Sequence, residues 1–431
     1  MATARVAVIG GGLGGLAAAA LLARDGCEVT LYERSKQLGG RGQTSDVEGF
    51  RFNLGPHALY RGGAALRVLG RLGVKPTGGA PGAGSYLLRG GRLHTMPRGL
   101  VSMMATDALG LSGKLELAKL LARVGSVDPA SLARTPMRAW VEQRLANEDA
   151  RDFVMALTRV MTYCADVEAL SAEVAVAQLQ ALPSVLYVDG GWSTLVSALE
   201  ARAREAGARL ALSARVTSVI LDEAGHGVRG VRLADGMEHA ADAVVVAGGP
   251  SDLAELLPGD AALARDAARA VPVKAATLEL GLSRLPRPDA LFALGGDGPW
   301  YASVHSAVAK LAPEGGAMVH VMQYLGGRGP EASEARLEEV MDVLQPGWRT
   351  SVVARRYRPS LRVSNWLPTA ETGGLAGRPP VEVPHVRGLY RVGDWVGPEG
   401  MLADASFASA ESAALALLGS QRAVSRRGMG A

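Results

Sequence analysis

The chain has 431 residues, of which 48% are hydrophobic and 20% are charged, a balance typical of a globular protein with two or three domains. The formal net charge is only +4 and the Arg residues are scattered, which argues against nucleic acid as a partner. The only cysteines, Cys27 and Cys164, exclude a disulfide framework, so a cytoplasmic location is expected.

Membrane insertion is not indicated by the sequence. Glycines interrupt the apolar stretch near the N-terminus, and no run of 18 purely apolar residues occurs elsewhere. The basic segment 421–427 could contact an anionic surface, which leaves peripheral membrane contact as an alternative.

The N-terminal segment has the pattern of a dinucleotide-binding βαβ unit. Residues 5–9 form a short apolar run typical of a buried parallel strand, and residues 10–15 then satisfy Gly-x-Gly-x-x-Gly. Gly10 permits the tight turn, Gly12 lets the backbone approach a pyrophosphate, and Gly15 lets the following helix pack on the strand. The positive end of that helix faces the phosphates. The expected contacts are Gly10, Gly12, Leu13, Gly14 and Gly15.

A second predicted strand, residues 28–32, ends at Glu33. Glu33 follows Gly15 by 18 residues, where the acidic residue that bonds a ribose 2′-hydroxyl belongs. This unit predicts a dinucleotide, but a nicotinamide dehydrogenase would satisfy it as well as a flavoprotein.

The segment after Glu33 discriminates between these cofactors. It runs from Arg34 to the turn Gly39-Gly40-Arg41. Together with the glycine loop and the acidic strand end, this turn resembles the flavin amine oxidase superfamily, specifically its phytoene-desaturase-like and protoporphyrinogen-oxidase-like branch. The resemblance implies that Arg34, Gly40 and Arg41 lie along the pyrophosphate and ribityl chain of FAD. The Arg41 guanidinium can neutralise anionic oxygens with a forked donor.

A second match lies at Phe52-Asn53-Leu54-Gly55-Pro56-His57, which resembles the family segment Phe-Asp-x-Gly-Pro-His beside the isoalloxazine ring. It implies that Gly55, Pro56 and His57 lie at the flavin, with Asn53 in place of the commoner Asp. His57 could donate to the flavin, line the substrate cavity or satisfy a hydrogen bond in the core.

Two central segments resemble further parts of the family's cofactor domain. Residues 214–221 are predicted to form a strand, and the resemblance implies that the backbone of Val216 reads the adenine edge. Residues 228–250 are predicted to form a hairpin and a buried strand that ends in glycine. The resemblance implies that the backbone passes the cofactor again at Gly248.

The third match is Gly388 to Trp395, which resembles the closing Gly-Asp motif of the family. It implies that Gly393 and Asp394 hold the ribityl chain, and that Met401 and Leu402 precede a helix, residues 406–418, whose N-terminus points at the flavin. A helix dipole stabilises the negative charge of a reduced flavin. No cysteine follows Leu389, so noncovalent FAD is expected.

These segments predict an α/β fold. A Rossmann-like FAD-binding domain of the GR2 type, discontinuous in sequence, is expected beside a substrate domain with a mixed sheet and helices. The FAD domain is assigned to 1–60, 185–265 and 380–431, and the substrate domain to 61–184 and 266–379. In the substrate domain five leucines mark one helix: Leu111, Leu115, Leu117, Leu120 and Leu121.

FAD chemistry requires no catalytic triad, and the sequence shows neither a triad nor metal-ligand spacing among its histidines. The catalytic residues stay unassigned. The leading hypothesis is a desaturase or dehydrogenase that removes hydride from an apolar isoprenoid, polyketide or other secondary metabolite, with O2 or a quinone-type compound as acceptor. A protoporphyrinogen oxidase, a flavin amine oxidase and a non-catalytic flavoprotein that binds a partner are the alternatives. No aromatic pair flanks a glycine near the closing motif, where Trp395 and Phe407 stand, and this weakens the amine oxidase alternative.

Overall fold

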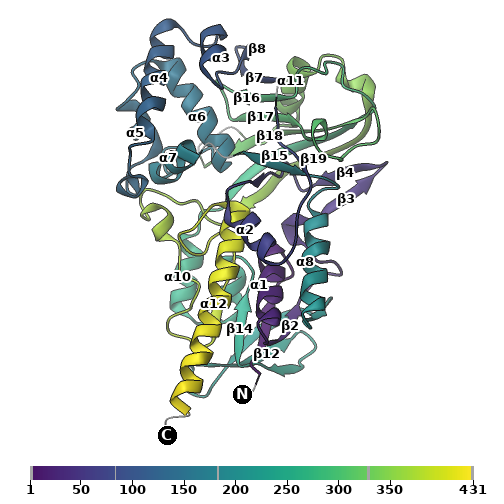
Figure 1. Cartoon of the computed structure of the whole chain (residues 1–431), viewed down its shortest axis with the longest axis vertical. Helices are drawn as coiled ribbons and strands as arrows, with labels where there is room; N and C mark the ends of the chain where they lie inside the picture. Colours follow the sequence, from purple (N-terminus) through teal and green to yellow (C-terminus); the bar gives the residue numbers. More distant parts are fainter. Residues whose placement is uncertain (1–2, 83, 182–183, 328–330, 429–431) are drawn as a thin grey trace.

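Five short parallel strands form the sheet that carries the glycine loop. The structure, a computed structural model, describes residues 3–82, 84–181, 184–327 and 331–428 (Figure 1). The sheet has the order β10-β2-β1-β14-β20, and every neighbouring pair is parallel. Its strands are β1 (Arg5–Ile9), β2 (Glu28–Tyr32), β10 (Arg209–Ala211), β14 (Ala243–Val246) and β20 (Leu389–Arg391). β14 is buried throughout, as expected for a parallel strand that is covered on both faces.

Helices cover one face of this sheet, and a second small sheet with two helices covers the other. On the first face lie α1 (Leu13–Arg24), α2 (Ala64–Arg71), α8 (Ser193–Glu205) and α12 (Leu402–Gly428). On the second lie β11 (Val216–Leu221), β12 (Val228–Leu233), β13 (Glu238–Ala240), α9 (Pro250–Leu256) and α10 (Ala261–Arg269). The side chains of the basic segment 421–427 lie outside the described ones.

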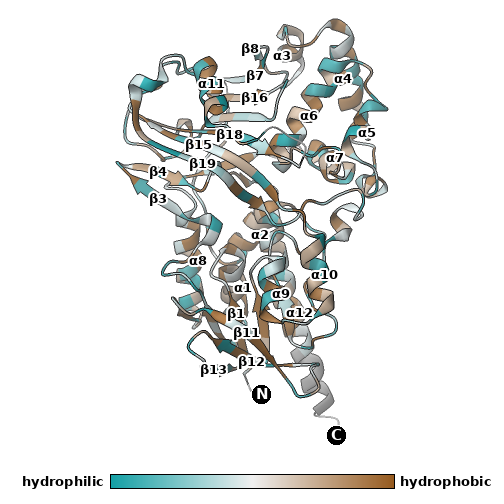
Figure 2. Cartoon of the chain, turned by 180° about the vertical axis from the view of Figure 1, so that it is seen from behind, coloured by the Kyte–Doolittle hydropathy of each residue, from teal (hydrophilic) through white to brown (hydrophobic). Residues whose placement is uncertain are grey.

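A seven-stranded mixed sheet forms the other half of the molecule (Figure 1). Its order is β19 (Val352–Ser364), β15 (Val273–Leu282), β18 (Ala317–Leu325), β17 (Trp300–Val304), β16 (Phe292–Gly295), β7 (Ser85–Arg89) and β8 (Arg92–Thr95). Figure 2 shows β15, β18 and β19 running side by side between α11 (Glu334–Leu344) and the parallel sheet. Beside the sheet lie α3 (Leu100–Ala105), α4 (Leu111–Val124), α5 (Met137–Glu142), α6 (Glu148–Thr162) and α7 (Ala172–Ala181).

Short strands connect the two halves. They are β3 (Thr44–Val47), β4 (Phe50–Asn53), β5 (Leu59–Tyr60), β6 (Gly78–Gly79) and β9 (Val185–Val188). β3 pairs with β4, and β9 pairs with both β5 and β6. The predicted α/β class is confirmed, whereas the assignment of residues to two domains stays a prediction.

The predicted helices form, but two differ in extent or exposure. α12 begins at Leu402, four residues before the predicted start at Ser406. α4 contains the five leucines, yet Leu117 and Leu120 are buried, whereas Leu111, Leu115 and Leu121 are 73%, 55% and 37% exposed. The leucines therefore lie on two different faces of the helix.

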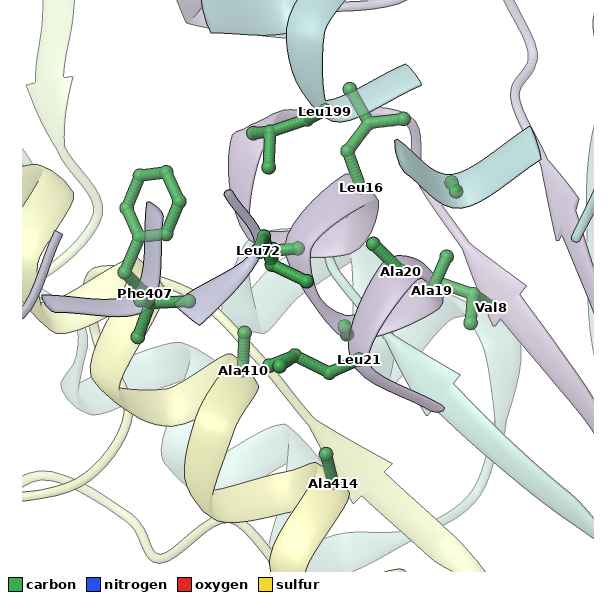
Figure 3. Packing of buried hydrophobic residues seen from close by; sticks show 14 of the residues in the cluster. Val8, Leu16, Ala19, Ala20, Leu21, Leu72, Leu199, Phe407, Ala410 and Ala414 are labelled. Atoms are coloured by element: carbon green, nitrogen blue, oxygen red, sulfur yellow. The ribbon is translucent and has the colours of Figure 1, made fainter. Parts of the chain in front are cut away.

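The N- and C-terminal segments pack together through small side chains. Figure 3 shows Ala410 of α12 beside Leu21 of α1, with Ala414 below them and Phe407 at the left of the same cluster. Alanines let two helices approach closely, and Phe407, which is fully buried, fills the remaining space. This contact brings the last helix of the chain against the first.

A buried carboxylate fastens the seven-stranded sheet to the segment that contains Gly55. Glu279 on β15 accepts hydrogen bonds from Arg356 Nε at 2.8 Å and from the Gly55 amide at 3.3 Å. Arg356 also donates to the backbone oxygen of Asn53. Burial raises the pKa of Glu279 to about 7, although Arg356 opposes the shift. The neighbouring His320 has a pKa lowered to about 3 by burial, so it stays neutral beside Glu279.

The first prediction concerns Phe407. Phe407→Ala leaves a cavity in the hydrophobic cluster that α12 shares with α1 and α2, and we expect it to lower the free energy of unfolding by about 3 to 5 kcal/mol in chemical denaturation at fixed FAD concentration. Leu415→Ala on the same helix is the control, because Leu415 is 57% exposed and its truncation leaves no cavity. Equal losses for both variants would contradict the assigned packing.

The second prediction concerns pH. Above the ordinary pKa of a glutamate, Glu279 ionises in the unfolded chain but stays protonated in the folded one until about pH 7, so the wild type loses stability across that window. The variant Glu279→Gln cannot ionise and so lacks this loss. The difference in free energy of unfolding between the variant and the wild type should therefore increase in favour of the variant by on the order of 2 kcal/mol between pH 4.5 and pH 7. Denaturation curves measured at several pH values test this. The exposed Glu339→Gln should show no such trend.

Candidate functional site

One cavity of about 630 Å³ runs along the carboxyl end of the parallel sheet and reaches the face of the seven-stranded sheet. Its volume lies within the usual range of small-molecule sites. Among the residues proposed from the sequence, the wall contains Gly10, Gly12, Leu13, Gly14, Gly15, Glu33, Arg34, Gly40, Arg41, Pro56, His57, Val216, Gly248, Gly393, Asp394 and Leu402. Gly55 and Met401 are not wall residues. Segments far apart in the chain therefore meet at one cavity.

The glycine loop and the Gly-Gly-Arg turn lie side by side in this wall. The Gly39 amide donates to the Gly11 carbonyl at 2.8 Å. A Cβ atom on Gly15 would lie 2.0 Å from the Gly10 carbonyl oxygen, whereas one on Gly12 would meet nothing within 4 Å. Gly15 is therefore required for packing, and Gly12 borders open space at the N-terminus of α1. An extended pyrophosphate fits such a backbone cradle.

Glu33 is held rigidly at the end of β2. Its Oε2 atom accepts from the Gly11 amide at 2.7 Å, and its Oε1 atom accepts from the Ser35 amide at 2.8 Å. A carboxylate can accept about four hydrogen bonds, so capacity remains for ribose hydroxyls. Arg34 beside it is mostly exposed and lies 3.7 Å from Asp252, a separation too long for a strong ion pair.

An ion pair joins the Gly-Gly-Arg turn to the closing Gly-Asp motif. Arg41 lies 2.6 Å from Asp394, and Asn365 donates to the same carboxylate through its side chain at 2.9 Å and its amide at 3.2 Å. Asp394 is buried, which by itself would raise its pKa, but Arg41 and Asn365 outweigh burial and hold the pKa below its usual value. Asp394 is therefore a charged residue of the wall.

Both ring nitrogens of His57 face backbone oxygens. Nδ1 lies 2.9 Å from the Gly55 oxygen, and Nε2 lies 3.1 Å from the Arg41 oxygen. Burial lowers the pKa of His57, so the ring is neutral and donates one of these bonds. The ring packs edge-on against Trp192 at 4.6 Å. Of the three roles considered, this geometry favours a structural hydrogen bond at the cavity wall.

Two residues that support the closing motif were not foreseen. Arg378 is buried and donates to the Asp394 carbonyl at 3.1 Å and the Gly400 carbonyl at 2.6 Å, and burial lowers its pKa to about 10. Asn365 belongs to the wall through its contact with Asp394. Neither lies in a recognisable motif, because each acts through contacts that are distant in sequence.

The start of α12 also forms part of the wall. Leu402, Ala403, Asp404 and Ser406 line the cavity. The Oδ1 atom of Asp404 accepts from the Ala65 amide at 2.8 Å and so caps the first turn of α2. Burial raises the pKa of Asp404 to about 6. Asp404 stands within the C-terminal stretch that signalled the flavin site, but its contact with α2 could not be read from the sequence.

The end of the cavity that meets the seven-stranded sheet is aromatic and apolar. Tyr60, Tyr163, Trp192, Met322 and Leu361 line it. Tyr60 donates to the Met161 carbonyl at 2.9 Å, which fixes its ring. Burial raises the pKa of both Tyr60 and Tyr163, so both phenols stay neutral.

Two further features concern only the described ranges of the chain, namely metal sites and membrane-spanning helices. Within them, no group of three His, Cys, Asp or Glu side chains could hold a metal ion. Also within them, no helix is both long and apolar enough to cross a bilayer.

Comparisons with known proteins identify the family of the chain. Residues 13–418 match the family of flavin-containing amine oxidoreductases. A short segment of 51 residues is 55% identical to a carotenoid 3,4-desaturase of Haloarcula japonica, and it covers 12% of this chain. The match spans 10% of the desaturase's own length.

Solved structures show the same fold over nearly the whole chain. An oxidoreductase from Methanosarcina mazei is 20% identical with a TM-score of 0.74, covering 95% of this chain and 99% of its own. A putative protoporphyrinogen oxidase from Exiguobacterium sp. is 18% identical with a TM-score of 0.68, covering 97% and 99%. Sequence identities this low show only that the fold is shared. Because the family match extends over most of the sequence, the chain belongs to the flavin-containing amine oxidoreductases and is an FAD-dependent oxidoreductase.

Proposed function

We propose that this enzyme binds FAD noncovalently along the cavity wall and removes hydride from an apolar isoprenoid-type small molecule. The observation that carries the proposal is the continuity of one cavity, from the charged end at Glu33 to the aromatic end at Tyr163 and Met322. The short match to a carotenoid desaturase supports this substrate class.

Each part of the wall suits one part of the cofactor. The amides at the start of α1 and the Gly12 cradle would hold the pyrophosphate, and Glu33 would accept from the adenosine ribose. Asp394, fixed by Arg41 and Asn365, would accept from the ribityl chain. The start of α12 would direct its positive end toward the ring. Gly55, which bonds Glu279, and the buried Met401 do not line the cavity and would support the wall residues beside them.

The protein's contribution to the reaction is placement and exclusion of water. Bound FAD supplies an acceptor for a hydride or two electrons. Neutral Tyr60 and Tyr163 with Met322 and Leu361 provide an apolar surface that favours the transfer of a hydrocarbon chain out of water. We propose O2 or a quinone-type compound as the final electron acceptor.

Two alternatives use the same cofactor site. A protoporphyrinogen also offers an apolar ring system to an aromatic wall, and the fold is shared with a putative protoporphyrinogen oxidase. An amine would be protonated in water, and the apolar side chains of Met322 and Leu361 offer its charge no partner, although Asp404 lies elsewhere in the wall. The geometry therefore favours a hydrocarbon over an amine.

The third prediction concerns Glu33. Glu33→Ala removes a charge-assisted hydrogen bond to the ribose and the support of the Gly11 amide, so FAD should bind roughly 10- to 100-fold more weakly in equilibrium titration of the apoprotein. Glu28→Ala is the control, because Glu28 begins the same strand and pairs with Arg209 on the surface. Unchanged affinity for Glu33→Ala would contradict the ribose assignment.

The fourth prediction concerns the substrate. Under anaerobic conditions, acyclic polyenes should bleach the visible absorbance of the bound flavin, and polyamines should not, because the aromatic end of the wall is apolar. Porphyrinogens are tested beside them, and reduction by these alone would favour the protoporphyrinogen alternative. Reoxidation by O2 or by a quinone then identifies the acceptor. A flavin that no compound reduces would favour a non-catalytic role.

A further inference from the structure

The helix α4 is apolar on two opposite faces, only one of which the protein covers. Leu117, Leu120 and Val124 are 0%, 7% and 6% exposed and pack into the core of the helical region. On the other side Leu111 and Leu115 are 73% and 55% exposed, and the exposed Ala118 and Ala122 continue their row. These four positions follow the spacing i, i+4, i+7 and i+11, which places them on one stripe of a helix. One apolar stripe of α4 thus faces solvent.

The preceding helix α3 extends this exposed surface. Its Val101 and Met104 are 84% and 66% exposed. Together with Leu111 these are the three most exposed large apolar side chains among the described residues. Figures 1 and 2 show α3 and α4 together at the end of the molecule farthest from the parallel sheet. Apolar side chains gathered in this way mark an interaction site rather than ordinary surface variation.

Basic side chains flank the apolar stripe. On a helical projection of 100° per residue, Lys114 lies on one side of the stripe, and Lys119 and Arg123 lie on the other. Between residues 98 and 124 the acidic residues are Asp107 and Glu116. Asp107 bonds His94 at 2.8 Å, and Glu116 bonds the Asn147 amide at 2.9 Å. The cations therefore dominate the charge around the stripe.

We propose that this α3–α4 surface (Val101, Met104, Leu111 and Leu115, with Lys114, Lys119 and Arg123) docks on the surface of an anionic lipid bilayer. An apolar stripe between lysines is the arrangement with which an amphipathic helix lies in a membrane interface, its cations at the headgroups and its apolar side chains below them. A second copy of the chain is a poorer occupant, because a symmetric contact would oppose the lysines of one copy to those of the other. The proposal does not depend on the identity of the substrate.

The proposal is tested by flotation of the FAD-loaded enzyme with vesicles of phosphatidylcholine that contain about 30 mol% phosphatidylglycerol. The wild type should float with these vesicles and much less with pure phosphatidylcholine. Leu111→Ser/Leu115→Ser should reduce the bound fraction roughly tenfold, because the buried apolar area is lost. Lys114→Gln/Lys119→Gln should weaken binding to the anionic vesicles and lessen its dependence on salt.

A matched control uses exposed apolar residues elsewhere. Met237 and Val353 are 56% and 48% exposed, and Met237→Ser/Val353→Ser should leave vesicle binding unchanged. Flavin absorbance and thermal unfolding of every variant verify that the fold is intact. A wild type that does not float with anionic vesicles would overturn the proposal, as would equal losses for both apolar double variants. Sedimentation gives the other overturning result, a concentration-dependent dimer that Leu111→Ser/Leu115→Ser abolishes.

Discussion

The ion pair between Arg41 and Asp394 is the contact on which the rest of the site depends. It joins a turn near the start of the chain to a motif near its end, across a sequence separation of 353 residues. The carboxylate is buried and would be costly to ionise without this partner, so the two motifs stabilise each other. Asn365 and Arg378 complete the arrangement by bonding the Asp394 carboxylate and the Asp394 backbone oxygen. The glycine loop, the Gly-Gly-Arg turn and the start of α12 can then face one cavity.

A second buried polar contact sets the position of the other half of the molecule. Glu279 and Arg356 connect the seven-stranded sheet to the segment 53–55, and that segment leads directly to His57 in the cavity wall. The sheet thereby places Met322 of β18 and Leu361 of β19 at the apolar end of the cavity. A site that is charged at one end and apolar at the other results from joining two differently built halves, one with a parallel sheet and one with a mixed sheet.

The exposure of α4 shows where an apolar pattern has two possible causes. Leucines that pack into a core and leucines that contact an external partner give the same helical periodicity. Leu117 and Leu120 face the protein core, whereas Leu111 and Leu115 face solvent. The sequence pattern of the two pairs does not show this difference. Lys119 and Arg123 are exposed on the uncovered side, and this coincidence of charge and exposure distinguishes a docking surface from a poorly covered core.

The sequence by itself determined the α/β class and the membership in a flavoprotein family, and most of the residues that it proposed for the cofactor line the cavity. The sequence could do so because the local backbone requirements of the site select particular residue types at nearby positions. Gly10 has φ +105° at the turn, Gly15 packs against Gly10, and Glu33 follows the end of its strand. The tertiary structure alone decided that His57 faces two carbonyls, and that Asn365, Arg378 and Met322 belong to the site. These residues act through partners distant in the chain, and no local pattern records such a contact. The tertiary structure also decided which face of α4 is covered, because the apolar periodicity of a helix does not show which elements pack against it.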